Sequence, residues 1–406
     1  MSDASVPERS GAPAGLLPLL YLLAFVVMAD GRVIATVLPQ VAGDLDTTVA
    51  GVGAALTAYL LAYGVFQLVW GPLADRVGPM RVVATVAIAF APVLAVTALV
   101  PTLEALIGMR LLAGAVAAAF FPSALATVGY LIPYEDRHQA VAMLLAAVAA
   151  GQVMGATLGG LLAEVVDWRA MYVVDGALMA LLVAPLWRMR SATPVPERAA
   201  TSPFEAHRRL LRTGRALVLY TAVLVEGALF FGGTAYLGAL LRERYGLSYA
   251  VIGLIVALDG VAILVTSRAV ARLARRFGEN RLIVGGGLLM GGAFLFALAV
   301  PSWLAVIPAV ISLGAGFALC HTTFQIRATE LAPLARGTAI SLFAFSLFLG
   351  SGVGTAALGA LVEAEGYDAL LATCGVGLAA LGLIAPRLTE LRVSEPERPT
   401  PTPSSG

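Results

Sequence analysis

Charged residues are scarce in this chain of 406 residues, and lysine is absent altogether. Only 13% of the residues are charged, whereas soluble domains carry about 25%, and 59% are hydrophobic. This composition leaves too little polar surface for a soluble fold, and it excludes a soluble enzyme, a nucleic-acid-binding protein and a disordered chain. A polytopic membrane protein remains, and its 43 glycines suit helices that pack closely in lipid.

Cysteine and histidine are also rare, which removes several kinds of site. Cys320 and Cys374 both lie in apolar runs, and this argues against a disulfide framework. The three histidines lack HExxH spacing, and no GKS or GKT phosphate loop is present. We therefore predict no metal, no cofactor and no catalytic residues, and no direct use of ATP.

Apolar runs of about 20 residues can cross a hydrocarbon core of about 30 Å as helices. Twelve such runs are present, and their short connections favour antiparallel neighbours. The first run is expected to be a retained helix rather than a cleaved signal peptide, because no small-residue cleavage site follows it. The expected spans are residues 15–39, 50–71, 81–100, 103–131, 139–163, 170–189, 214–241, 248–267, 281–300, 303–327, 336–362 and 367–387.

Arginine marks one side of this membrane topology. With a cytoplasmic N-terminus, 21 of the 26 arginines fall in cytoplasmic segments, and only Arg169, Arg242 and Arg244 lie on the opposite side. Cytoplasmic loops of membrane proteins carry such an excess. We therefore expect a multi-pass protein of the inner (cytoplasmic) membrane with both termini in the cytoplasm.

The longest connection divides the twelve spans into two halves. It is rich in proline, serine and arginine, whereas the C-terminal segment is rich in proline, serine and threonine and is expected to be disordered. The fold class expected is all-α, with two pseudo-symmetric six-helix bundles. The expected organisation is an N-terminal tail at 1–14, a first bundle at 15–189, a central loop at 190–213, a second bundle at 214–388 and a tail at 389–406.

The two halves share a short sequence. LADRVGPMR at 73–81 aligns without gaps to LARRFGENR at 273–281, with an offset of 200 residues. The same offset carries the first span onto the seventh, so a duplication is predicted. Paired halves with a site at their interface suit a secondary transporter.

The segment Gly71-Pro-Leu-Ala-Asp75-Arg76-Val-Gly78-Pro-Met-Arg81 resembles the signature loop of the major facilitator superfamily. Gly71 would let helices approach closely, and Gly78 would permit a tight turn. Asp75 could face the N-terminus of the eleventh span, near Arg336–Gly337, where the helix dipole favours an anion. The resemblance implies a cytoplasmic gate at this loop; the alternative is a solvated turn that only sets topology.

Three further stretches resemble the drug:proton antiporters of that superfamily. The first, in the first span, runs from Asp30-Gly-Arg to Leu38-Pro39 and is followed by Asp44-Leu45. The second, in the fourth span, runs from Arg110 to Gly114 and is followed by Phe121-Pro122. The third, in the fifth span, contains Gly151, Gly155, Gly159 and Gly160 and is followed by Asp167-Trp168-Arg169. Ala156 stands where the antiporter motif normally has proline, so the kink of that motif is not expected.

Ionisable side chains inside spans cost roughly 2.5–3.5 kcal/mol each on insertion scales, so they usually face a cavity or a partner. By the helical rise, Asp30 and Arg110 lie about 13 Å and about 11 Å from the same membrane surface. We expect them to pair or to share a water, with Asp30 as a proton acceptor. A static buried ion pair is the alternative.

The other intramembrane charges are assigned separately. Arg32 points away from Asp30 on the same helix, and we expect Asp175 or Glu164 to neutralise it. Glu226 has no basic residue at helical spacing, which makes it a second candidate for proton coupling or for binding a cation. Arg32 and Asp259 are also candidates for proton coupling or for the substrate cavity, although packing or a hydrogen bond is favoured for Asp259; for His321 we expect a hydrogen bond between helices. Aromatic side chains available to stack on a substrate, or to pack on neighbouring helices, are Phe120, Phe121, Phe230, Phe231, Tyr236 and Phe324.

These observations predict a transporter that exports a hydrophobic or amphipathic drug or metabolite, driven by the proton gradient, by alternating access. Its expected partners are a small-molecule substrate, protons and the bilayer, with no nucleic acid, and a monomer is expected. The alternative is a proton-coupled importer or facilitator of a small polar metabolite on the same fold. An intramembrane protease would need a catalytic dyad, and Gly350-Ser-Gly352 has no positioned histidine.

Overall fold

The computed structural model describes residues 13–193, 207–208, 210–331 and 336–389. Most of both predicted tails and part of the predicted central loop lie outside these residues. Every regular element within them is a helix, as the composition predicted. The helices are α1 (Leu16–Asp44), α2 (Val49–Val77), α3 (Pro79–Thr97), α4 (Leu103–Ala117), α5 (Phe120–Leu131), α6 (Tyr134–Val165), α7 (Arg169–Arg188), α9 (Gly214–Ala235), α10 (Leu237–Tyr245), α11 (Tyr249–Phe277), α12 (Glu279–Ala299), α13 (Trp303–Leu331) and α14 (Arg336–Thr389).

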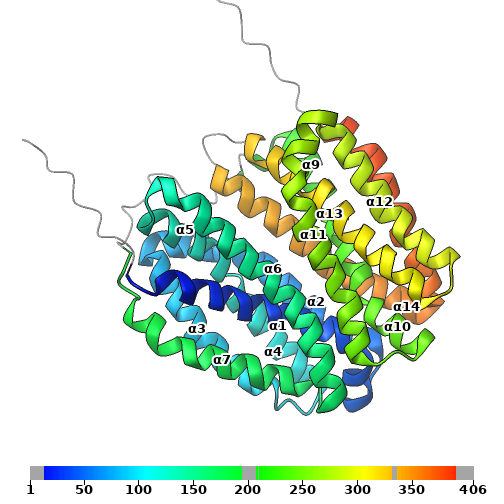
Figure 1. Cartoon of the computed structure of the whole chain (residues 1–406), viewed down its shortest axis with the longest axis horizontal. Coiled ribbons are helices and arrows are strands. Elements are labelled where there is room, and N and C mark those ends of the chain that lie inside the picture. Colours follow the sequence, from blue (N-terminus) through cyan, green and yellow to red (C-terminus); the bar gives the residue numbers. More distant parts are fainter. Residues whose placement is uncertain (1–12, 194–206, 209, 332–335, 390–406) are drawn as a thin grey trace, which may run out of the picture.

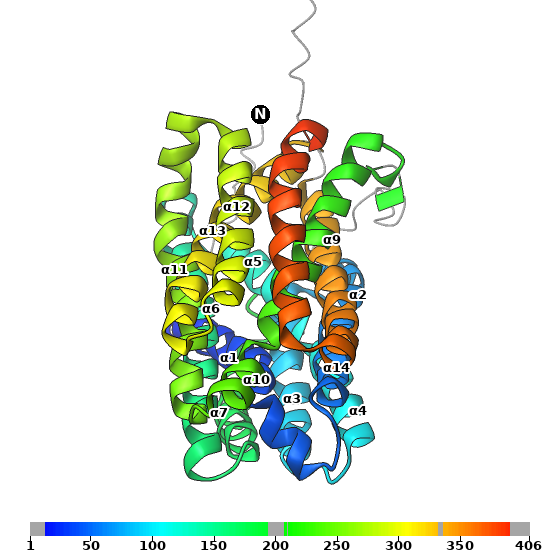
Figure 2. The ribbon, with the colours of Figure 1, turned by 90° about the vertical axis from the view of Figure 1, so that its right-hand side faces the viewer.

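Each of the twelve predicted spans corresponds to helix in the structure. Among the described residues, eleven helical segments are long and apolar enough to cross a membrane, and the last of them, Gly337–Leu388, has 52 residues. The backbone of Gly366, with φ 80° and ψ −177°, breaks α14 into two helices. Figure 2 shows these two parts, orange and red, running in opposite directions. The eleventh segment therefore contains the two last spans.

Several helices continue beyond their apolar runs. α1 extends to Asp44, past the predicted end of the first span, with Pro39 inside it and a non-helical Val37. A helix satisfies its own backbone groups, so it does not have to stop where the apolar run stops. Because α1 runs from residue 16 to residue 44, Asp30 lies at its midpoint, deeper than the shorter predicted span implied.

The helices form two groups that meet along one seam. Figure 1 shows α1 to α7 on one side of the molecule and α9 to α14 on the other. Across the seam α1 contacts α10 and α11, α2 contacts α14, and α6 contacts α11. The seam is therefore formed by helices from both halves of the chain.

The turn predicted at Gly78 occurs twice. Gly78 links α2 to α3 with φ 95° and ψ 132°, and Gly278 links α11 to α12 with φ 84° and ψ 153°. A positive φ favours glycine because it has no Cβ. The two aligned sequences thus adopt the same backbone geometry 200 residues apart, which supports the predicted duplication.

Candidate functional site

A buried ion pair lies in the middle of the first group of helices. Arg110 on α4 donates a hydrogen bond from Nη1 to Oδ1 of Asp30 on α1 at 2.6 Å, and both side chains are fully buried. The Arg110 guanidinium also lies 4.3 Å from the ring centre of Tyr59 on α2. The matching depths predicted this pairing from the sequence.

Glycines of α6 hold the helix that carries Asp30. A Cβ at Gly151 or at Gly155 would collide with the backbone of Phe25 or Ala29 on α1, and one at Gly159 would touch Val33. These contacts repeat every four residues on both helices, above and below Asp30. Gly160 instead approaches the backbone of Tyr249 on α11, across the seam. The glycine motif therefore fixes the position of α1 within its bundle and against the other half.

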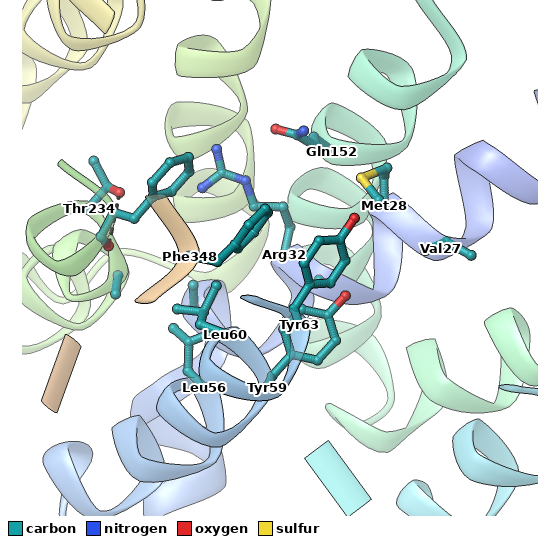
Figure 3. A pocket seen from close by; sticks show the side chains of 14 residues that line it. Val27, Met28, Arg32, Leu56, Tyr59, Leu60, Tyr63, Gln152, Thr234 and Phe348 are labelled. Carbon is teal, nitrogen blue, oxygen red and sulfur yellow. Dashed lines mark hydrogen bonds between the residues drawn. The ribbon is translucent and has the colours of Figure 1, made fainter. Parts of the chain in front are cut away.

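A cavity lies beside Asp30, between the two groups of helices. In Figure 3, the rings of Tyr59, Tyr63 and Phe348 and the guanidinium of Arg32 lie around it. Gln152 and Thr234 are among the few other polar residues in its lining. Asp30 itself is not in the lining, but the next residue, Gly31, is. The remaining lining residues are Val27, Met28, Ala35, Leu56, Leu60, Phe231 and Ala235.

The aromatic lining differs from the one predicted. Of the six candidates only Phe231 lines this cavity. Phe230 instead stacks on Phe317, with ring centres 4.3 Å apart, and Phe120 and Phe324 are buried in the core. Helix periodicity in a span that is apolar all round does not reveal which face meets a cavity, so no sequence pattern pointed to Tyr59, Tyr63 or Phe348.

Arg32 and Asp259 form an ion pair across the seam, which corrects the partners predicted for Arg32 and supplies the hydrogen bond expected for Asp259. Arg32 Nη2 on α1 donates to Asp259 Oδ2 on α11 at 2.7 Å. The predicted partners of Arg32, Asp175 and Glu164, were wrong. Glu164 instead accepts a hydrogen bond from the backbone N–H of Tyr249 at 2.8 Å, again across the seam. Asp259 has a charged partner because the two halves meet here, which is not visible in its own span.

Glu226 has a partner as well, although none was found within its span. Its Oε2 lies 2.9 Å from Nδ1 of His321, so α9 and α13 are joined by a hydrogen bond in the second group of helices. Glu226 is fully buried, and the ring of His321 stacks on Phe317. The interhelical hydrogen bond expected for His321 is therefore present, and the unpaired state expected for Glu226 is wrong.

The structure describes only part of the predicted gate loop, residues 71–81, because the side chain of Asp75 lies outside the described residues. Arg76 and Arg81 are exposed, and α14 starts at Arg336, where the eleventh span was expected to begin. No described atom lies within 4 Å of a Cβ placed on Gly71, so the close approach predicted there is wrong in this conformation. The side chains of Asp75 and Arg336 lie outside the described residues, and their contact stays a prediction.

Two motifs noted separately in the sequence meet at the far end of α1. Asp44 Oδ2 accepts hydrogen bonds from Trp168 Nε1 at 2.9 Å and from Arg169 Nη1 at 2.7 Å. The guanidinium of Arg169 also lies 4.3 Å from the ring centre of Trp168. The end of α1 and the start of α7 are thus held together at the surface opposite the predicted cytoplasmic side.

The overall arrangement matches solved transporter structures. The crystal structure of a mutant of the nucleoside transporter NupG superposes with a TM-score of 0.78 at 17% sequence identity, covering 93% of this chain and 100% of that chain. This likeness concerns the fold alone, and it agrees with the all-α membrane architecture predicted from the sequence.

Sequence relatives are bacterial transport and resistance proteins. The multidrug efflux pump LfrA of Mycolicibacterium smegmatis is 25% identical, with 89% of this chain and 83% of that protein covered. The methylenomycin A resistance protein of Streptomyces coelicolor is 26% identical, covering 97% and 96%. The family model of the Major Facilitator Superfamily matches residues 20–343 and 241–406, which together span most of the sequence. This chain, with its two bundles, duplicated glycine turn and central cavity, belongs to the Major Facilitator Superfamily of transporters.

Proposed function

We propose that this protein exports hydrophobic or amphipathic compounds in exchange for protons, by alternating access. The main observation in support is the buried Asp30–Arg110 pair, which adjoins a predominantly apolar and aromatic cavity between the halves. The names of the two relatives, an efflux pump and an antibiotic resistance protein, support export of drug-like molecules. The arginine distribution supports a cytoplasmic membrane protein with both termini in the cytoplasm, and we propose that it acts as a monomer and not as an enzyme.

The cavity lining supports an amphipathic cargo. Tyr59, Tyr63, Phe231 and Phe348 offer ring faces, and apolar side chains occupy most of the remaining wall. The charge of Arg32 is compensated by Asp259. A small polar metabolite would need several convergent hydrogen-bonding groups in such a pocket. An importer of such a metabolite is therefore the less favoured function.

Contacts across the seam support a state closed at one end. Arg32 pairs with Asp259, Thr57 Oγ1 donates to the Gly352 carbonyl at 3.4 Å, and Glu164 binds the Tyr249 backbone. These residues lie toward the end of the bundles away from the Gly78 and Gly278 turns. With the turns in the cytoplasm, this is a state closed to the outside, and rocking of the halves about the cavity gives the opposite state.

Proton coupling follows from the chemistry of the ion pair. Asp30 cannot remain charged in this buried site without Arg110, because an unpaired buried charge costs several kcal/mol. A proton on Asp30 releases Arg110, and loss of that proton restores the pair. Because Gly31 lines the cavity, a bound compound can alter this balance directly.

Reconstitution tests the proposal. The purified protein is placed in liposomes that enclose a pH-sensitive dye, a proton gradient is imposed, and a panel of neutral and cationic antibiotics and dyes is added. We expect compound-dependent proton movement with the natural protein, and none with Asp30→Asn. Exposed Asp46 provides the matched control Asp46→Asn, which should behave like the natural protein. Absence of compound-dependent proton movement across the whole panel would contradict the proposal.

A further inference from the structure

A second carboxyl group lies near the Asp30–Arg110 pair and has no hydrogen-bond partner among the described residues. Asp175, in the first half of α7, is fully buried. Neither of its oxygens makes a hydrogen bond to any residue that the structure describes. Buried polar groups in folded proteins are nearly always hydrogen-bonded, so an acid with two unpartnered oxygens needs an explanation.

The surroundings of Asp175 identify the charges that act on it. It interacts electrostatically with Asp30 of α1 and with Arg110 of α4, and Tyr172 lies one turn before it on the same helix. Tyr172 also lies under the Arg110 guanidinium, 5.7 Å from ring centre to Cζ. The cation that acts on Asp175 is thus the same guanidinium that binds Asp30.

The helices packed on α7 carry few other ionisable groups at this depth. The face of α3 near α7 presents Leu94 and Ala95, and no residue from Val82 to Thr97 is ionisable. α6 carries ionisable residues only near its ends, from its start to His138 and at Glu164.

The remaining ionisable groups near the pair lie on α1 and α2. Arg32 of α1 is bound to Asp259 across the seam, and Tyr59 of α2 interacts with both members of the Asp30–Arg110 pair. Arg110 is therefore the cation that Asp30 and Asp175 share.

The guanidinium retains unused donors. Arg110 binds Asp30 through Nη1, whereas its Nε and Nη2 have no hydrogen-bond partner among the described residues. On the acid side, Oδ2 of Asp30 and the hydroxyl of Tyr172 are likewise unpartnered within the described part of the chain. Two acids and one cation are thus buried on α1, α7 and α4, with donors and acceptors that have no partner among the described residues, and this permits more than one pairing.

We infer that Asp175 carries a proton while Arg110 is bound to Asp30, and that Arg110 can exchange its binding between the two carboxyl groups. Two charged carboxylates with one guanidinium would leave a net negative charge in a buried site, which is strongly unfavourable. One proton makes the group neutral, and like charges at a shared site cannot both ionise readily. This inference deepens the proposed proton exchange, on which it rests for its functional meaning.

The exchange is balanced in atoms and charge. The O–H bond of Asp175 breaks, an O–H bond forms on Asp30, and the guanidinium moves from Asp30 to the new Asp175 carboxylate. The group is neutral before and after. The proton moves from α7, which does not line the cavity, to a residue adjacent to the cavity wall at Gly31. Asp175 is thus a proton-storing residue for the transport cycle.

Infrared spectroscopy tests this without any substrate. The purified full-length protein is measured in detergent near neutral pH, where a protonated aspartate gives a carboxylic acid C=O band. We expect Asp175→Asn to lose this band. We also expect Asp30→Asn to lose it, because Arg110 is then free to bind Asp175 as a carboxylate. Asp46→Asn, an exposed substitution of the same kind, should keep it.

The second expectation separates proton storage from a structural role, since a merely packed Asp175 would keep its band in Asp30→Asn. Retention of the band in either variant overturns the inference. If a variant fails to fold, the infrared spectrum of the natural protein with isotopically labelled aspartate provides the test. Absence of a carboxylic acid band that shifts with the label near neutral pH would contradict proton storage by Asp175. These spectra are independent of transport, so failure of the liposome experiment and failure of this inference are distinguishable.

Discussion

At the scale of single residues, each half of this transporter contains a pair of an acid and a base inside its helices, and in each pair the acid is fully buried. Asp30 and Arg110 join the first and fourth spans, whereas Glu226 and His321 join the seventh and tenth. The pairs link corresponding helices of the two halves, although their residues are not at aligned positions. They differ chemically, because arginine offers a planar fork of five donors, whereas the histidine ring has two nitrogens.

Removing Arg110 alone should destabilise the protein. Arg110→Met leaves Asp30 buried without a cation, and breaking a buried pair in this way costs about 3–5 kcal/mol. We expect a clear loss of thermal stability of the purified protein in detergent. The double variant Asp30→Asn with Arg110→Met carries no uncompensated charge from the pair and should recover much of the loss. Equal stability of the single and double variants would contradict an energetically coupled pair.

At the scale of helices, close packing of α6 on α1 positions Asp30. The glycines at 151, 155 and 159 place backbone against backbone, which is how helices associate in lipid without a hydrophobic driving force. Proline is absent at position 156, so α6 runs from Tyr134 to Val165 without a proline inside it. The uninterrupted helix keeps its glycine face against α1 at three successive positions.

A single methyl group should disturb this packing. In Gly155→Ala the new Cβ meets the backbone of Ala29, which cannot move as a side chain can. Overpacking of this kind costs about 1–3 kcal/mol, and we expect lower thermal stability and weaker proton-coupled transport. The matched control is Gly129→Ala on α5, where no described atom lies within 4 Å of the added Cβ. Similar melting temperatures for the two variants would show that the contact is easily relaxed.

At the scale of the whole molecule, the two halves are held at one end by contacts that must break in alternating access. The Arg32–Asp259 pair is a charged element of this closure, and Arg32 also lines the cavity. A substrate in the cavity is therefore in reach of a residue that closes it. We therefore expect occupancy of the site to influence the position of the halves.

Reversing one charge of this closure should shift the conformational equilibrium. Arg32→Asp places two carboxylates together, and each ~1.4 kcal/mol lost from the closed state changes the population ratio about tenfold. We expect faster labelling of Thr57→Cys by a membrane-impermeant thiol reagent from outside, in a background where Cys320 and Cys374 are replaced. Adding Asp259→Arg restores opposite charges and should slow labelling again. A rate unaffected by Arg32→Asp would exclude this pair as part of the closure.

Composition and short motifs were sufficient to predict the fold class, the twelve spans and the depth-matched pair of Asp30 and Arg110. They were sufficient because lipid imposes strong, local constraints: spans must be apolar for about 20 residues, and a charge inside one must find a partner. The glycine turn at 78 and its repeat at 278 could also be predicted, because a short motif sets a local backbone geometry.

Helix packing, in contrast, established which partners meet and which faces line the cavity. Arg32 and Asp259 are 227 residues apart, Glu226 and His321 are 95 apart, and the pairs form because helices from different parts of the chain pack at particular rotations. The neighbours of Asp175 could not be predicted from the sequence for the same reason, because nothing within its span indicates that it lies near Arg110. The hydrophobic pattern of a membrane helix fixes its length and depth, whereas its rotation and neighbours follow from packing against the other helices.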